Sequence, residues 1–468
     1  MATYYVRTDG SDSNSGTSNS AGGAWATVQK ACNTVTAGDV VNIETGTYAE
    51  TPTMATSGSV GNLITFQKAP GASAIIDGGT GTHDFNAHTF RLNGSYVKLD
   101  GLEIKRGRGQ GVYITGQSCT VTRCLVHTIQ NTGIYCYYGY TPTITFNTIH
   151  DCFEIAAGGN SDGITVTNNF EHEPANATIT DNVIYNISDD GIDVFTTQGN
   201  TIARNVVYNC GPSYVGSASG NGNGIKCGPG GNNTVTNNAI ANCQNIGLAG
   251  NEGPGTEFYN NTVYNCTAYN VANWGAGTGC TYSNNISYTG SVLMDASPTQ
   301  QTNTWNLGIT NPQFVSTDPV NANFLRLSAG SPAIDVGTDV GLSYNGSAPD
   351  LGAYEFSSTA TLSISVTDLV TVVDTTTLVL LSGGAALAMA VSDAVAVAES
   401  VSVQLSALQF SVFDSITVTE NIGIVFYPNT VLSIATSESI TVSETSPVAV
   451  YYAGDPASAT GMLAMVLL

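Results

Sequence analysis

A unit of 23 residues recurs through the middle of this chain, and that period limits what the chain can fold into. Its marker is Asn-x-Ile/Val, found at Asn147, Asn182, Asn205, Asn238, Asn261 and Asn284. Cys124 takes the Asn position in an earlier copy, and four of the six intervals are 23 residues long. A second marker, a Gly before an aliphatic residue, keeps the same phase at Gly133, Gly163, Gly191, Gly224 and Gly247. One repeating unit, lengthened by insertions, explains both series.

A 23-residue unit rich in Val, Ile, Thr and Asn is typical of three short strands joined by turns, which is one coil of a parallel β-helix. One coil cannot bury its apolar face alone, but stacked coils share a core and pair their backbones at about 4.8 Å. The Asn positions should form a hydrogen-bonded ladder along one turn, and the Gly should supply a tight bend. We therefore predict an all-β solenoid.

The composition changes after Phe356. Beyond it there is no Lys, Arg, His, Cys or Trp, and acidic residues recur in pairs six positions apart: Asp368 with Asp374, Asp393 with Glu399, Asp414 with Glu420, and Glu438 with Glu444. The pairs repeat at intervals of 25, 21 and 24 residues with alternating aliphatics between them, which predicts strands. We expect a β-helix domain over 1–356, a linker over 357–360 and an acidic β-strand region over 361–468. That region would serve attachment, a stalk or oligomerisation, or be a small β-sandwich without a binding role.

The start of the chain enters a strand at once, with no visible signal peptide. Trp25 to Asn33 predicts a short amphipathic helix that caps the open end of the solenoid. The uncharged stretch Thr376–Ser392 has only 17 residues and contains two glycines, so we expect no membrane span. The expected location is extracellular: secreted, on a cell surface, or on a virion assembled in the host cytoplasm.

The net charge of −23 argues against nucleic acid as a partner, and an acidic polymer would bind only if a cation mediated. The ten cysteines include four that lie five residues after the repeat Asn: Cys152, Cys210, Cys243 and Cys266. We interpret these four as a reduced, buried column, because free Cys packs like a small apolar residue. No CxxC zinc spacing is present.

Charged residues gather around the repeat Gly of neighbouring coils. The position before this Gly is Thr132, Asp162, Asp190 and Asn223 in turn, and the position two after it is Tyr135, Thr165, Asp193 and Lys226. Equivalent residues of adjacent coils lie about one strand spacing apart, so Asp162 should stack near Asp190, and Asp193 near Lys226. Asp189 adds a carboxylate to the same turn.

Such a group of carboxylates repels strongly unless a cation neutralises it, and one lysine is not enough. Oxygen ligands in an irregular set suit Ca²⁺. Three insertions fall beside these coils, in Phe153–Ser161, Asn169–Ala175 and Gly211–Gly222. We expect them to wall a cleft, with Phe170, Glu171, His172 and Tyr214 in its walls.

Plainer explanations exist for each part of this cluster. Asp-Gly is an ordinary turn pair, so one copy alone would indicate only a bend. A lysine beside carboxylates could be a simple ion pair, although an exposed pair of this kind stabilises little. The whole set, with Lys226 adjacent, favours a functional site over these explanations.

The segments NSDGI, SDDGIDVF and GNGIKCGPGGN, in this order, resemble the active-site segments of polysaccharide lyase family nine, the pectate lyase type. The opening YYVRTDGSDSNSGT and the closing FLRLSAGSPAID and PDLGAYEF are similar to elements of the same group, so the resemblance covers roughly residues 3 to 356. It implies a right-handed parallel β-helix. It also implies calcium binding by Asp162, Asp189, Asp190 and Asp193, of which Asp162 matches less closely, and a catalytic base at Lys226.

The implied reaction is β-elimination on a uronate polysaccharide, with an acidic polysaccharide as the partner. A metal-independent glycoside hydrolase is a second hypothesis, since the aspartates could supply its two carboxyl groups. All five histidines precede Asp189, however, so the downstream Gly-His-Gly of polygalacturonases is absent. A third hypothesis is a non-catalytic virion, filament or adhesive subunit that assembles through 361–468 as a homo-oligomer or larger assembly.

Overall fold

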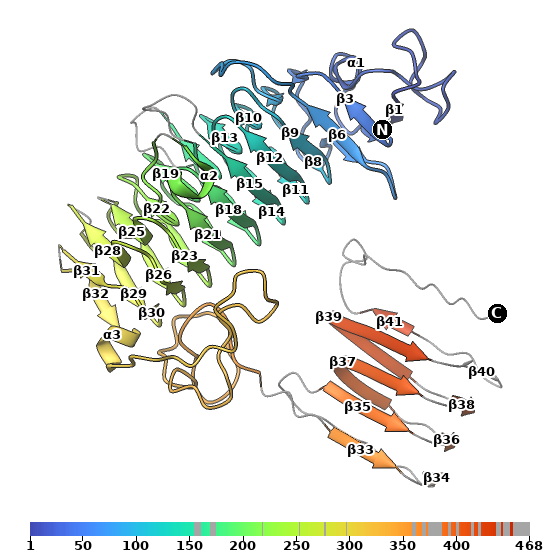
Figure 1. Ribbon diagram of the computed structural model, residues 1–468. Coiled ribbons are helices and arrows are strands. Elements are labelled where there is room, and N and C mark those ends of the chain that lie inside the picture. Colours follow the sequence, from blue (N-terminus) through green and yellow to red (C-terminus); the bar gives the residue numbers. More distant parts are fainter. Residues whose placement is uncertain are drawn as a thin grey trace. The chain divides into compact units, whose positions relative to one another are not determined.

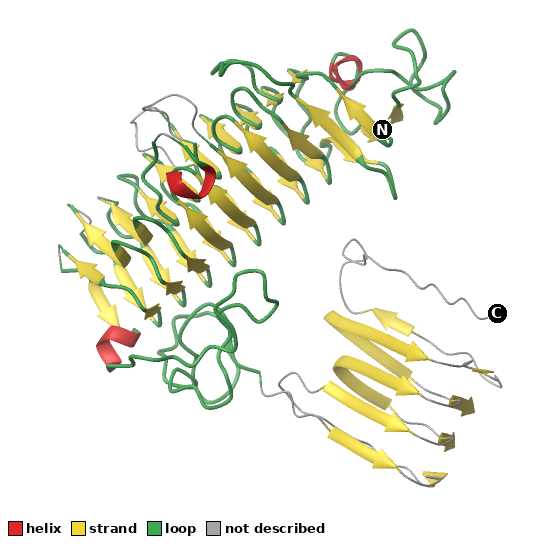
Figure 2. Ribbon diagram, viewed as in Figure 1, coloured by secondary structure: helices red, strands yellow, loops and turns green. Residues whose placement is uncertain are grey.

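The computed structural model describes residues 1–153, 161–168, 175–217, 219–251, 253–275, 278–295 and 297–357, and beyond these only strands of the C-terminal region. The chain divides into two compact units, Met1–Phe356 and Ser357–Leu468. Strands dominate the first unit (Figure 1), and the three helices among its described residues are each a single short turn (Figure 2). Among the described residues no helix is long and apolar enough to cross a membrane.

The first unit is a parallel β-helix built from three sheets, in which every strand pairs with its equivalent one coil away. The predicted all-β solenoid is confirmed. The first sheet has twelve strands: β1 (Thr3–Val6), β2 (Val40–Ile43), β5 (Ile64–Lys68), β8 (Val97–Asp100), β11 (Thr120–Thr122), β14 (Thr143–Thr145), β17 (Thr178–Thr180), β20 (Thr201–Ala203), β23 (Thr234–Thr236), β26 (Glu257–Tyr259), β29 (Thr281–Ser283) and β32 (Thr299–Gln301).

The other two sheets have ten strands each. The second sheet holds β3 (Gly46–Tyr48), β6 (Ala74–Asp77), β9 (Glu103–Lys105), β12 (Leu125–Ile129), β15 (Thr148–Cys152), β18 (Val183–Ile187), β21 (Val206–Cys210), β24 (Ala239–Ala241), β27 (Thr262–Tyr264) and β30 (Ile286–Tyr288). The third holds β4 (Thr53–Met54), β7 (Phe90–Leu92), β10 (Val112–Ile114), β13 (Ile134–Tyr137), β16 (Ile164–Thr167), β19 (Ile192–Phe195), β22 (Ile225–Cys227), β25 (Ile246–Asn251), β28 (Tyr269–Trp274) and β31 (Val292–Met294).

The core lies inside the coils, because alternate residues of each strand point inward. The residue after the repeat Gly is the inward one: Ile134, Ile164, Ile192 and Ile225 pair in register and are fully buried. All ten cysteines are free and buried, which confirms the predicted reduced column. The next residue of each of these strands, two positions after the Gly, therefore points to the outward face of the third sheet.

The predicted ladder of Asn side chains is present along one turn. The backbone N–H of Asn182 donates to Asn205 Oδ1 at 3.1 Å, and that of Asn205 donates to Asn238 Oδ1 at 2.9 Å. The prediction of Asn284 in this ladder is wrong, because the Asn261 N–H donates to Asn285 Oδ1 instead. Asn284 takes the left-handed turn position, with φ of 59°, just before the ladder. The Asn284-Asn285 doublet makes the two positions look alike in the sequence.

Both ends of the β-helix are covered. The predicted helix over Trp25–Asn33 is shorter, because α1 spans Val28–Cys32 with Thr27 as its N-cap. Trp25 lies before the helix, where its backbone forms a bridge to Val6 and its buried ring stacks on Tyr4. The other end has α3 (Thr304–Leu307), followed by an irregular segment up to residue 357. Phe324 and Leu325 of this segment pack on Tyr208, Ala239 and Ala241, on the outward face of β21 and β24 in the second sheet.

The second unit contains two parallel sheets. One has the order β33 (Leu362–Val366), β35 (Ala386–Val391), β37 (Ser402–Val412), β39 (Gly423–Thr436) and β41 (Val450–Tyr452), and the other β34 (Thr371–Val372), β36 (Val395–Ala398), β38 (Ile416–Thr419) and β40 (Thr441–Val442). In the smaller sheet Thr371 pairs with Ala396, Val395 with Ile416, and Thr417 with Thr441. These offsets of 25, 21 and 24 residues equal the spacing of the acidic pairs.

Candidate active site

The acidic cluster lies where three strands of the third sheet begin. The chain turns at Gly163, Gly191 and Gly224 into β16, β19 and β22, respectively. At Gly191 a Cβ would come within 2.3 Å of Val207 Cγ1 and 2.6 Å of the Gly224 carbonyl oxygen. Only glycine allows adjacent coils to approach this closely, and the approach brings the preceding aspartates together.

Asp162 stacks beside Asp190 on the adjacent coil, as the sequence predicts, and the two also form a second ladder of hydrogen bonds. Asp162 Oδ1 accepts the Asp190 N–H at 3.1 Å, and Asp190 Oδ1 accepts the Asn223 N–H at 3.0 Å. Asn223 then accepts the Ile246 N–H through its own Oδ1 at 3.2 Å. An asparagine therefore makes the same backbone contact as an aspartate here. The ladder does not require the negative charges of Asp162 and Asp190.

Lys226 lies beside Asp193 on the adjacent strand, and the two are register partners. Its Nζ donates to Asp193 Oδ2 and to Asp190 Oδ2, both at 3.0 Å. It also lies 5.6 Å from the ring centroid of Phe195, a contact that the sequence reasoning did not include. Phe195 could have been expected, since it lies two residues after Asp193 and so on the same face.

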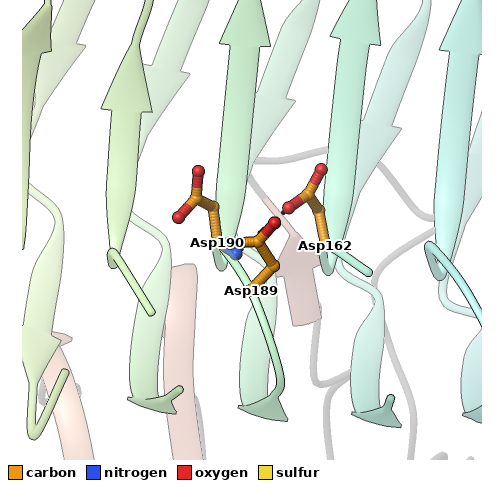
Figure 3. A group of neighbouring side chains, drawn as sticks. All are labelled: Asp162, Asp189 and Asp190. Atoms are coloured by element: carbon orange, nitrogen blue, oxygen red, sulfur yellow. Dashed lines mark hydrogen bonds between the residues drawn. The ribbon is translucent and has the colours of Figure 1, made fainter. Parts of the chain in front are cut away.

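The carboxylates of Asp162, Asp189 and Asp190 form one buried group (Figure 3). One oxygen from each lies within 4.8 Å of the others. Asp193 is not part of this compact group but turns toward Lys226, and its buried Oδ1 has no hydrogen-bond partner among the described residues. Thr165, whose register position was predicted but whose contact was not, donates to Asp162 Oδ2 at 2.5 Å.

This donor set fits a hard divalent cation. The site holds four carboxylates but only one ammonium group, that of Lys226, which pairs with Asp190 and Asp193. Ca²⁺ prefers carboxylate oxygen ligands of this kind. The unpartnered Oδ1 of Asp193 is a buried acceptor that a cation would satisfy. A buried negative charge of this density is costly without a counter-ion.

The pKa shifts have the same cause. Burial, followed by the neighbouring carboxylates, raises the pKa of Asp162 well above its usual range. Burial and then Asp190 raise the pKa of Asp189 to about 7. Burial raises the pKa of Asp193 to about 6, although Lys226 opposes this. Burial lowers the pKa of Lys226, but the carboxylates of Asp193 and Asp190 outweigh burial and raise it, so Lys226 is protonated without a metal.

The insertions can be compared only in part with the predicted cleft walls. The third contains α2 (Pro212–Val215), which carries the exposed Tyr214, and the Asn221 N–H of this insertion donates to Asp189 Oδ1. This insertion therefore adjoins the carboxylate group. Most of the first two insertions, with Phe170, Glu171 and His172, lies outside the described residues.

Known proteins share this architecture. Residues 4–285 match the family model described as Pel9A-like, right handed beta helix region. Pectate lyase L of Dickeya dadantii (strain 3937) is 30% identical over 398 residues, which cover 75% of this chain and 90% of that protein. Pectate lyase L of Dickeya chrysanthemi is also 30% identical, over 399 residues.

Solved structures agree. The crystal structure of pectate lyase Pel9A matches with a TM-score of 0.68 and 26% identity, covering 76% of this chain and 96% of that one. A rhamnogalacturonan lyase shares the fold, with a TM-score of 0.52 and 19% identity over 70% of this chain and 97% of its own. The chain therefore belongs to the Pel9A-like right-handed β-helix family and is a pectate lyase-like polysaccharide lyase.

Proposed function

We propose that this enzyme cleaves a uronic-acid-containing, pectate-like polysaccharide by calcium-dependent β-elimination. The observation that carries the proposal is one lysine beside four buried carboxylates, two of which, Asp162 and Asp190, hold ladder positions that an uncharged asparagine fills one coil away. The printed names of the pectate lyase relatives support this substrate class.

Asp162, Asp189, Asp190 and Asp193 would hold the calcium ion, which would draw charge from the sugar carboxylate, acidify its C5 proton and lower the pKa of Lys226. Neutral Lys226 would take the C5 proton as the general base. The electron pair of the C5–H bond would then form a C4=C5 double bond, and the C4–O bond would break. The departing oxygen would take a proton from water. Phe195 would keep one side of the Lys226 amine away from water.

The charge balance of the chain supports the need for a cation. An acidic protein repels an acidic polymer over the range of the Debye length, so it needs a bridging positive charge at the point of contact. We propose accordingly that the enzyme acts outside the cell, where such polymers occur, or on the surface of a virion. Residues 361–468 would then attach the catalytic unit or join copies of it.

The test is incubation of the full-length protein with polygalacturonate and other uronate polymers, in calcium and in excess chelator. We expect unsaturated, ultraviolet-absorbing products in calcium and none in chelator. Saturated reducing ends would indicate hydrolysis and contradict the proposal. Undiminished elimination in chelator would remove calcium from it.

A further inference from the structure

A row of outward side chains leads away from Lys226 along the third sheet. Its members pair strand by strand in register: Lys226, Asp193, Thr165, Tyr135, Tyr113 and Arg91. Five strand spacings separate Lys226 from Arg91, or roughly 24 Å at about 4.8 Å each. On the other side of Lys226 the row continues as Ala249, Ala272 and Leu293, which offer no charge or hydrogen-bonding group. The polar and aromatic groups thus lie toward the N-terminal coils.

Aromatic rings in this part of the row are stacked. Tyr113 and Tyr135 lie 5.7 Å apart with planes at 9°, and Tyr137 lies 6.0 Å from Tyr135. Tyr113 and Tyr135 are only half-buried, and none of the apolar clusters formed by the described residues includes these three tyrosines. The similar stack on the second sheet differs, because its last ring, Tyr208, is covered by Phe324. Tyr113 also stacks on the buried His88, with ring centroids 4.1 Å apart and planes at 3°, so the ring faces of this stack are covered within the protein and the half-buried tyrosines offer their outward edges.

Arg91 ends the row with a positive charge. Its guanidinium lies 5.1 Å from the ring centroid of Tyr113, and its Nε donates to Asn93 Oδ1 at 2.9 Å. Arg91 forms no ion pair with any carboxylate of the described residues, whereas most of the other arginines do. In a chain of net charge −23, an arginine without an acidic partner is available for an external anion.

We propose that Arg91, Tyr113 and Tyr135 form a binding platform for the acidic polysaccharide, in which Arg91 binds a carboxylate several sugars away from the bond that is cut. The outward edges of Tyr113 and Tyr135 line the path between Arg91 and Lys226, where their phenolic hydroxyls can hydrogen-bond with hydroxyl groups of the sugar chain. This inference rests on the proposed function, because the ligand is the uronate polymer named there. Arg91 is a positioning residue and takes no part in the proton transfer.

The experiment compares Arg91→Gln with the wild-type protein on polygalacturonate and on its trisaccharide. We expect KM for the polymer to rise about ten-fold at low salt, because a charged hydrogen bond is lost. A trisaccharide bound at Lys226 does not reach Arg91, five strands away, so its KM should be the same in Arg91→Gln and wild type. The ratio of the trisaccharide KM to the polymer KM should therefore fall toward one in the variant. At high salt the polymer KM of wild type and variant should converge. Arg91→Lys should recover part of the loss.

Lys68→Gln is the matched control, since it removes one positive charge from an exposed site at the end of β5 on the first sheet. An equal rise of KM in both variants, or none in Arg91→Gln, would overturn the platform.

Retention of each protein in a gel containing polygalacturonate separates the two proposals. Weaker retention of Arg91→Gln together with no wild-type cleavage supports the platform and refutes the lyase reaction on this polymer. Normal cleavage with unchanged KM refutes the platform alone.

Discussion

The aspartates of the site have two separable tasks. Asp190 accepts a backbone N–H as a ladder residue and also contributes charge beside Lys226. Asparagine can perform the first task, as Asn223 does one coil away, but not the second. Asp190→Asn should therefore keep the melting temperature close to that of the wild type while weakening calcium binding at least ten-fold. Calorimetric calcium titration and thermal unfolding measure the two effects. Asp190→Ala is the control, because it leaves a buried N–H unsatisfied and should cost about 1–3 kcal/mol.

The raised pKa values make the calcium-free protein sensitive to pH. The folded-state pKa is about 7 for Asp189 and about 6 for Asp193, above the ordinary aspartate pKa of 3.8. The folded state then binds more protons than the unfolded state, so stability falls as pH rises through these values. In chelator we expect a lower melting temperature at pH 8 than at pH 5, and Asp189→Asn should reduce the difference. A stability that rises over this range would show that these carboxyls are not buried against one another.

At the scale of elements, the Asn ladder fixes one turn of the coils from Asn147 to Asn285. Asn205 Oδ1 accepts the backbone N–H of Asn182, and its Nδ2 donates to the Ile179 carbonyl at 2.9 Å. Asn205→Ala leaves buried polar groups without partners, so the free energy of unfolding should fall by about 3 kcal/mol. Val183→Ala, which changes an outward side chain on a neighbouring coil, should change it by less than about 0.5 kcal/mol. Denaturant unfolding measures both, and equal effects would contradict a ladder role.

Elements in register were predictable from the sequence, and others were not. The 23-residue period predicted the columns of Asn, Asp and Lys, because a parallel coil places equal phases one strand apart. The last predicted ladder position was placed at Asn284, but Asn285 occupies it. The sequence pattern does not show which residue of an Asn-Asn doublet takes the ladder position. The segment after α3 has no period, so its packing on Tyr208 could not be predicted. The partners Thr165 and Asn221 depend on side-chain and loop conformations that a period does not encode.

At the scale of the whole molecule, the two units differ in composition and in strand arrangement. A solenoid gains its stability from contacts between neighbouring coils, so the first unit should fold without the second. Deleting residues 361–468 should leave the melting temperature of the first unit unchanged and its kcat within about two-fold of that of the full chain. Size-exclusion chromatography of both proteins tests whether the second unit joins copies. Loss of activity in the shortened protein would show that the second unit contributes to catalysis.

The central claim is that Lys226 abstracts the proton, and Lys226→Arg tests it most directly on polygalacturonate in calcium. Arginine keeps the positive charge and can keep the ion pairs with Asp190 and Asp193, but it does not lose its proton at neutral pH. We predict a loss of kcat of about 10²–10⁴-fold, the range that a general base contributes, with melting temperature and calcium affinity preserved. Wild-type rates of unsaturated product release from Lys226→Arg would contradict the account.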